Sequence, residues 1–177
     1  MNALLIIDMQ KGSFKPYSLR HDTLGTIERI NSIAKKCRSK NIPVIFIQHD
    51  GSKENCFYPD SEDWEILPEL EILPSDIIIG KTANDAFYNT LLDSTLRDKN
   101  ISELLITGCA TDFCVDATVK SALGKDYKVT IIEDGHTTAS RPFIDAQTVI
   151  NHYNWLWSEM SPTLYKLTVL KTADIEF

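Results

Sequence analysis

The sequence predicts an α/β fold in which a mainly parallel sheet carries helices on both of its faces. Two patterns lead to this prediction. Short apolar runs recur along the chain without the alternation of a half-exposed strand, as is typical of strands covered on both faces. Stretches with apolar residues at helical spacing separate these runs. Regular exchange of strand and helix favours right-handed crossover units and a three-layer arrangement.

The same two patterns place the individual elements. Strands are expected at residues 4–7, 43–47, 77–79, 104–107 and 129–132, with a short edge strand at 167–170. Helices are expected at residues 23–40, 86–98, about 111–124 and 143–160. Residues 49–74 are irregular and contain three prolines, and a connection this long is more often functional than idle. A chain of 177 residues suits one domain, which we expect to span 1–177.

Composition and charge narrow the classes of partner. The formal net charge of −7 argues against nucleic acid as a partner. The apolar start of the chain has no basic region before it and meets a charge at Asp8, so we expect neither a signal peptide nor a membrane span. The four cysteines include no Cys-x-x-Cys pair, and we expect them to be reduced thiols in the cytoplasm.

Three polar residues follow three of the expected strands and carry most of the functional signal. Asp8 comes directly after the first strand, Lys81 follows the third, and Cys114 lies beyond the fourth, at the start of a helix. The carboxyl ends of parallel strands share one edge of the sheet, where ligands bind. Each residue also has a purely structural explanation: Asp8 as a turn residue, Lys81 as a solvated cation and Cys114 as an inert core thiol. Their joint placement favours a shared site.

These three side chains fit the chemistry of a nucleophilic hydrolase. A helix N-terminus and a neighbouring ammonium group lower the pKa of a thiol from its ordinary value of about 8.5, so we expect an activated Cys114. Asp8 is expected to take the thiol proton and to return it to a leaving amine. Lys81 would offset the repulsion between carboxylate and thiolate. The backbone amides that precede the helix are candidates for an oxyanion hole.

Other chemistries at such a sheet edge fit the residues less well. Aspartyl phosphatases of the haloacid-dehalogenase type need a second carboxylate two residues after the first, and Gln10 stands there. Receiver domains need an acceptor Asp after the third strand, where this chain has Lys81. A redox pair of Cys109 and Cys114 would need a geometry that allows a disulfide. A ligand-binding protein without catalysis stays an alternative.

The motifs around these residues resemble those of the isochorismatase-like cysteine hydrolase superfamily. The matching pieces are Leu-Ile-Ile-Asp-Met-Gln at 5–10, Ile-Gly-Lys at 79–81 followed by Ala86, Phe87, Thr90 and Leu91, Ile-Thr-Gly-Cys-Ala-Thr-Asp-Phe-Cys-Val at 106–115 with Thr118, and Glu-Asp-Gly at 133–135. They occur in the order and spacing of the family and span most of the chain. Each piece alone is weak evidence, and together they are strong.

This resemblance implies a Rossmann-like, six-stranded sheet in the order 3-2-1-4-5-6 and a catalytic triad of Asp8, Lys81 and Cys114. It also implies a cis peptide bond between Cys109 and Ala110, with the amides of Ala110 and Cys114 forming the oxyanion hole. Members that cleave a vinyl ether commonly lack the cysteine, so its presence favours hydrolysis of an amide, lactam or carbamoyl C–N bond. Isochorismatase-type ether hydrolysis stays an alternative, and a homo-oligomer, dimer or larger, is expected.

The resemblance also bears on metals. Nicotinamidases of this superfamily carry Asp-x-His and further histidines that bind a divalent metal. Here the corresponding residues are Gln48, His49 and Asp50, and the next histidine along the chain is His136. We therefore expect no metal and no cofactor, and a place in the metal-free branch that includes streptothricin hydrolase-like proteins.

Residues that contact the substrate are harder to identify. We expect them among side chains that follow the first two strands, flank the nucleophile or lie in the irregular segment: Gln10, Phe14, His49, Trp64, Thr111 and Phe113. Phe87 is at helical spacing, which favours a place in the core over one in the pocket. A structural hydrogen bond is an equally good role for His49. The substrate is expected to be a small molecule.

Overall fold

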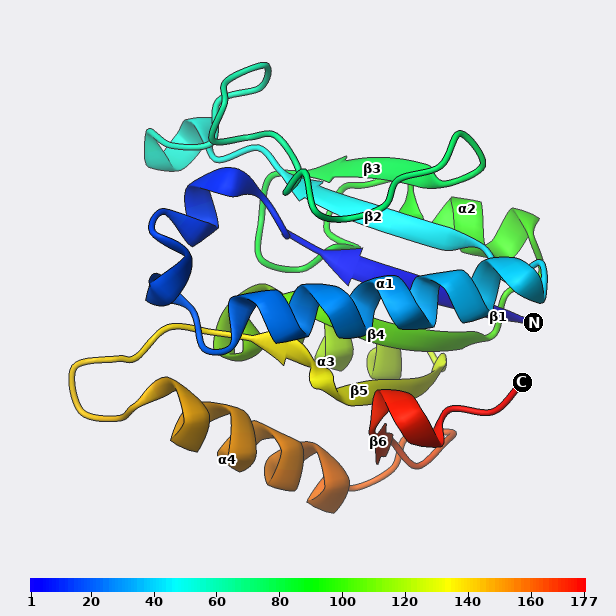
Figure 1. Cartoon of the computed structure of the whole chain (residues 1–177). Helices are drawn as coiled ribbons and strands as arrows, with labels where there is room; N and C mark the ends of the chain where they lie inside the picture. Colours follow the sequence, from blue (N-terminus) through cyan, green and yellow to red (C-terminus); the bar gives the residue numbers. More distant parts are fainter.

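The computed structural model describes residues 1–177, and a six-stranded parallel sheet lies at its centre in the order β3-β2-β1-β4-β5-β6. The strands are β1 (Asn2–Ile7), β2 (Val44–His49), β3 (Ile77–Lys81), β4 (Glu103–Cys109), β5 (Lys128–Thr137) and β6 (Thr168–Leu170). The longer helices are α1 (Thr23–Ser39), α2 (Leu92–Asp98), α3 (Asp116–Gly124) and α4 (Ala146–Glu159). The predicted fold class and strand order are confirmed (Figure 1).

The central strand β1 separates two hydrophobic cores because its side chains alternate between the two faces of the sheet. Leu4 and Ile6 pack with the buried face of α1 on one side. Leu5 and Ile7 pack on the other side with residues of α2 and α3 and with Trp157 of α4. Every residue from Ala3 to Ile7 is buried, which explains why the strand reads as an unbroken apolar run.

Helix α1 follows the predicted spacing closely. Its buried positions are Thr23, Thr26, Ile27, Ile30, Ile33, Ala34 and Cys37, which form one stripe along the helix. The helix ends where Asn41 adopts a left-handed conformation with φ of 56°, two residues before Pro43. No helix of the structure combines the length and the apolar character needed to cross a membrane.

The prediction of a helix at 86–98 is wrong for its first half, because α2 begins only at Leu92. Side chains bind the backbone before that point. The Asp85 carboxylate accepts from the Phe87 amide at 2.8 Å, and the Thr90 hydroxyl donates to the Ala86 carbonyl at 2.6 Å. The Ala86 amide donates to Thr118 of α3 at 3.1 Å. Such bonds compete with helical ones, and here they hold the chain after β3 in a series of turns.

Helix α4 is also shorter than predicted, because Asp145 caps it. The Asp145 side chain accepts from the Thr148 amide at 2.9 Å, so the helix begins at Ala146 rather than at Phe143. Strand β5 is longer than predicted and extends to Thr137. The expected irregular segment between β2 and β3 is present, and its one short helix is the 3₁₀ turn Ser52–Glu54.

Candidate active site

Asp8, Lys81 and Cys114 meet at the carboxyl edge of the sheet. Asp8 follows the last residue of β1, Lys81 is the last residue of β3, and Cys114 lies in the turn after β4. The Lys81 ammonium nitrogen is 2.6 Å from Asp8 Oδ2 and 3.4 Å from Cys114 Sγ. The convergence predicted from the three strand ends is therefore present in the structure.

The backbone around Asp8 depends on a close approach between β1 and β4. Asp8 has a left-handed φ of 48°, and its amide donates to the Ile47 carbonyl at 2.9 Å. Gly108, opposite Ile7, has a φ of 121°. A Cβ atom there would lie 2.2 Å from the Ile7 carbonyl oxygen, so only glycine fits this position. The absence of a side chain at Gly108 lets the strand that carries the thiol lie against the strand that carries the carboxylate.

Cys114 lies in a single turn of π-helix, Thr111–Val115, between β4 and α3. The Cys109–Ala110 peptide bond before this turn is cis, as the sequence resemblance implied. The Ala110 carbonyl accepts from the amides of Phe113 and Val115 at 3.0 and 3.2 Å. Among the hydrogen bonds outside the regular elements, none uses the Ala110 amide. That amide is thus available to a ligand oxygen, as the expected oxyanion hole requires.

A buried chain of hydrogen bonds fixes the beginning of the π-helical turn. Thr111 Oγ1 is 2.9 Å from His136 Nδ1, and His136 Nε2 is 2.9 Å from Asn154 Oδ1. The Asn154 amide group donates to the Glu133 carbonyl, which leaves its oxygen to accept from the imidazole. His136 is therefore neutral with its proton on Nε2. Burial lowers the pKa of His136 to about 4, in agreement with that state.

A second contact fixes the middle of the turn to the loop after β5. The Asp112 carboxylate accepts from the Arg141 guanidinium at 2.7 and 2.8 Å and from the Thr138 hydroxyl at 2.6 Å. These bonds hold the pKa of Asp112 below its ordinary value although burial opposes this. The Arg141 guanidinium also lies 4.8 Å from the centre of the Phe113 ring, at the distance of a cation–π contact.

Burial dominates the electrostatics of the three converging residues. It raises the pKa of Asp8, an effect that the positive charge of Lys81 opposes. Burial and the negative charge of Asp8 raise the pKa of Cys114, and the nearby Lys81 offsets only part of this. The sequence had led us to expect a lowered pKa for Cys114, and that expectation is wrong. Burial and the charge of Asp8 both favour the protonated thiol.

The remaining contacts leave one carboxylate atom free beside the thiol. Asp8 Oδ1 is buried and has no hydrogen-bond partner, whereas Oδ2 is bound to Lys81. Lys81 also donates to the Ala83 carbonyl at 2.9 Å, and its ammonium nitrogen is 3.3 Å from His49 Nδ1. Cys114 Sγ lies 3.6 Å from Asn84 Oδ1. With Oδ2 bound to Lys81, Oδ1 is the carboxylate oxygen available to receive a proton.

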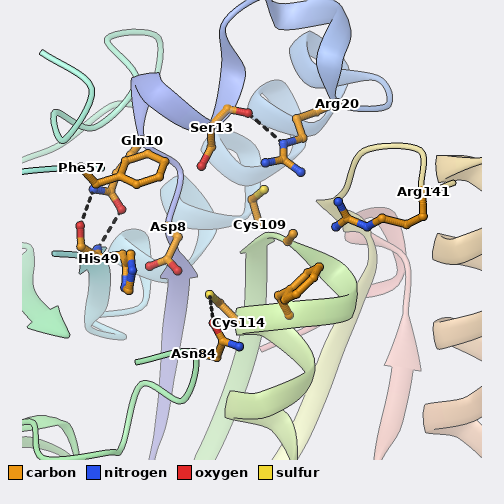
Figure 2. Close-up of a pocket in the computed structure, with 12 residues that line it drawn as sticks. Asp8, Gln10, Ser13, Arg20, His49, Phe57, Asn84, Cys109, Cys114 and Arg141 are labelled. Atoms are coloured by element: carbon orange, nitrogen blue, oxygen red, sulfur yellow. Dashed lines mark hydrogen bonds between the residues drawn. The ribbon is translucent and has the colours of Figure 1, made fainter. Parts of the chain in front are cut away.

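A cavity of about 200 Å³ opens over these groups (Figure 2). Its lining residues come from the segment after β1, the irregular segment, the turns after β3, the π-helical turn and the loop after β5: Asp8, Gln10, Ser13, Arg20, His49, Phe57, Asn84, Cys109, Ala110, Phe113, Cys114 and Arg141. Pockets for drug-sized ligands have volumes of about 300–1,000 Å³. The cavity therefore suits a small molecule.

Three of the six expected substrate-binding residues line this cavity, namely Gln10, His49 and Phe113. The Gln10 side chain is also a structural bridge, because its amide nitrogen donates to the carbonyls of His49 and Trp64 at 2.9 Å. Its oxygen accepts from the His49 amide at 2.8 Å. Gln10 thus shapes the cavity wall with little capacity left for a ligand, whereas Phe113 is half exposed.

The other three expected residues do not line the cavity. Phe14 is fully buried in the core on the α1 side of the sheet. Trp64 contributes its carbonyl to Gln10 and Gln48. Thr111 is fully buried and its hydroxyl is engaged by His136. Because none of the three lines the cavity, the structure does not support the prediction that they bind substrate.

Sequence reasoning missed Arg20, Arg141, Asn84, Ser13 and Phe57, all of which line the cavity. None of them directly follows a strand. They lie in connecting segments that reach the cavity only through the tertiary fold. Arg141 is held there by the carboxylate of Asp112, two residues before Cys114, a contact that only the folded chain shows. No group of three or more His, Cys, Asp or Glu side chains in the structure is arranged to hold a metal ion.

Comparison with known proteins identifies the family of this chain. The model of the isochorismatase domain matches residues 2–160. The chain belongs to the isochorismatase family. A solved structure described as an isochorismatase family protein matches with a TM-score of 0.87 at 29% identity, covering 96% of this chain and 98% of that one. The resemblance found in the sequence is thereby confirmed.

Two relatives within the isochorismatase family are named for reactions. A streptothricin hydrolase of Streptomyces noursei is 27% identical over 142 residues, which is 80% of this chain and 56% of the relative. The ureidoacrylate amidohydrolase RutB of Cronobacter sakazakii is 37% identical over 89 residues, which is 50% of this chain and 38% of the relative. The matched part is about half of the first relative and a smaller part of the second.

Proposed function

We propose that this isochorismatase-family protein is a cysteine-dependent hydrolase that cleaves a C–N bond of a small amide or carbamoyl compound through a thioester. One observation carries the proposal. The buried Asp8–Lys81 pair has a free carboxylate oxygen, and the Cys114 thiol lies within reach of the pair at the mouth of a cavity. The names of streptothricin hydrolase and ureidoacrylate amidohydrolase support hydrolysis as the class of reaction.

The first half of the reaction forms the thioester. Asp8 Oδ1 accepts the thiol proton, and Cys114 Sγ attacks the substrate carbonyl carbon. Burial makes Asp8 a stronger base than an ordinary carboxylate, because its raised pKa favours the protonated form. The Ala110 and Cys114 amides hold the oxygen of the tetrahedral intermediate. Asp8 then donates the proton to the leaving nitrogen, and ammonia or an amine departs.

The second half releases the acid. With the amine gone, Asp8 is again a carboxylate and takes a proton from a water molecule, which attacks the thioester carbon. The intermediate collapses with cleavage of the C–S bond. The proton on Asp8 returns to the sulfur, so the resting state with a protonated thiol is restored. Lys81 stays paired with Asp8 Oδ2 and keeps one carboxylate oxygen directed at the thiol.

The decisive test is intact-mass analysis during turnover of a panel of small primary amides, carbamoyl compounds and lactams, with ammonia or amine release as the readout. We expect an acyl adduct that maps to Cys114 and loss of both adduct and turnover in Cys114→Ala. Cys37→Ala is the matched control, since Cys37 is a buried thiol on α1 far from the cavity. Full turnover by Cys114→Ala on any hydrolysed substrate would overturn the proposal.

A further inference from the structure

The charges around the cavity balance except at one residue. Asp8 pairs with Lys81 at 2.6 Å, and Asp112 pairs with Arg141 at 2.7 Å. Arg20 lines the cavity and has no carboxylate within 4 Å. A guanidinium group keeps its positive charge throughout the physiological pH range. The cavity wall of a chain with net charge −7 thus carries one uncompensated cation.

The Arg20 side chain is held in place and still has donors to spare. It follows the 3₁₀ turn Tyr17–Leu19, and its Nε donates to the Ser13 carbonyl at 2.8 Å. Neither terminal nitrogen has an acceptor in the chain, and neither is a fully buried unsatisfied atom, so both are open to solvent. Figure 2 shows the guanidinium of Arg20 pointing into the cavity, on the side of Cys109.

The neighbouring groups do not neutralise this cation. Cys109 also lines this side of the cavity, but burial raises the pKa of its thiol to about 11, so it is uncharged at neutral pH. Arg141 lines the cavity on the side opposite His49, and its own partner Asp112 is already bound through both oxygens. An anion placed near Arg20 would therefore meet donors and no competing carboxylate.

We propose that Arg20 binds a carboxylate of the substrate, so that the natural substrates are small amides or carbamoyl compounds that also carry an acid group. This inference rests on the proposed function, because it assigns the orientation of the substrate within the same cavity. The two free nitrogens of the guanidinium match the two oxygens of a carboxylate. The volume of the cavity leaves room for a short spacer between the acid and the scissile carbonyl.

The test compares amides of equal length with and without the acid group. The pairs are malonamate with propionamide, succinamate with butyramide, and glutaramate with valeramide. We expect kcat/KM for ammonia release to favour the acid member of at least one pair by about tenfold to a hundredfold, as a charge-assisted hydrogen bond is typically worth. Arg20→Gln should abolish this preference and Arg20→Lys should keep part of it. Lys35→Gln, which removes an exposed charge from α1, should leave it unchanged.

A second measurement decides the inference even if none of these amides is hydrolysed. The same compounds are used to protect Cys114 from iodoacetamide at pH 9, followed by peptide mass spectrometry. Acid members should protect at about tenfold lower concentration than neutral members, and Arg20→Gln should remove the difference. Selective protection without ammonia release would support the anion site while leaving the proposed hydrolase to the wider panel described above. Hydrolysis with no acid preference, or the absence of selective protection in all three pairs, would overturn the role of Arg20.

Discussion

The Lys81 ammonium nitrogen lies 2.6 Å from Asp8 Oδ2, and less than a tenth of either side chain is exposed to solvent. Removing one partner of a buried ion pair leaves an uncompensated charge, which costs about 3–5 kcal/mol. A buried carboxyl avoids this cost by binding a proton. The protonation state of Asp8 therefore depends on Lys81, and the reactivity of Cys114 depends on both.

Lys81→Gln is expected to move the acidic limb of the pH–rate profile to higher pH. The charge of Lys81 opposes the burial that raises the pKa of Asp8, so its removal raises that pKa further. Asp8 must be ionised to act as a base, and activity should appear only as pH rises through the new value. The measurement is kcat/KM for ammonia release from pH 5 to 10. Lys120→Gln removes a half-exposed cation of α3 that is paired with Asp116, and it serves as control. An acidic limb at the same pH in Lys81→Gln and wild type would contradict this account.

Asp8→Asn should separate the reactivity of the thiol from catalysis. The negative charge of Asp8 is one of the causes that raise the pKa of Cys114, so the amide variant should alkylate faster with iodoacetamide at neutral pH than the wild type. Hydrolysis should fall by about 10²–10⁴-fold, because the general base is lost. Alkylation is followed by peptide mass spectrometry, with Cys56 as the internal reference. Slower alkylation of Cys114 in this variant would mean that Asp8 activates the resting thiol.

Gly108→Ala should destabilise the protein by more than about 3 kcal/mol, since it combines a strained φ with a clash. The new Cβ would lie 2.2 Å from the Ile7 carbonyl oxygen. Gly124→Ala is the matched control, because no atom beyond its chain neighbours and its own helix backbone lies within 4 Å of the added Cβ at the end of α3. Urea denaturation followed by circular dichroism measures both variants. Equal stability of the two would show that β1 and β4 can separate without cost.

His136 should make the fold sensitive to acid. Its pKa is about 4 in the folded chain and about 6.5 when exposed, so only the unfolded chain binds its proton between these values. Stability contributed by neutral His136 is complete above pH 6.5 and is lost as pH falls towards 4, by about 3 kcal/mol in total. The free energy of unfolding is measured at pH 7.5 and at pH 4.5 in both proteins. The loss of stability between these two pH values should be smaller in His136→Gln than in the wild type, by most of the roughly 3 kcal/mol given above. An equal loss of stability in the two proteins would contradict the conclusion that His136 is buried and neutral.

The edge of the sheet was predictable from the sequence because strand ends are encoded locally. The apolar run up to Ile7 specifies the position of Asp8, and the runs before Lys81 and Cys114 do the same for their strands. Parallel pairing then brings the three ends together without further information. The turn at 82–91 was not predictable from periodicity, since side-chain hydrogen bonds from Asp85 and Thr90 replaced the helix that the apolar spacing favoured.

The cavity wall was less predictable because it is built from contacts between distant segments. Phe14 and Arg20 belong to the same stretch after β1, yet the first is buried in the core and the second lines the cavity. Nothing in the local pattern separates them. The pKa of Cys114 was mispredicted for a related reason. The lowering effects of a helix start and of Lys81 can be read locally, whereas burial and the charge of Asp8 arise only in the folded chain.

In the function we propose, the residue that selects the substrate belongs to a different part of the fold from the residues that cleave it. Asp8, Lys81 and Cys114 are anchored to strands, but Arg20 follows a short turn in the connection between β1 and α1 and is tied to Ser13 in that same connection. Exchange of residues 11–22 for the corresponding stretch of a relative would therefore transplant a binding preference while the sheet keeps its reactive edge. This connection is the natural target for redirecting the protein to neutral or cationic amides.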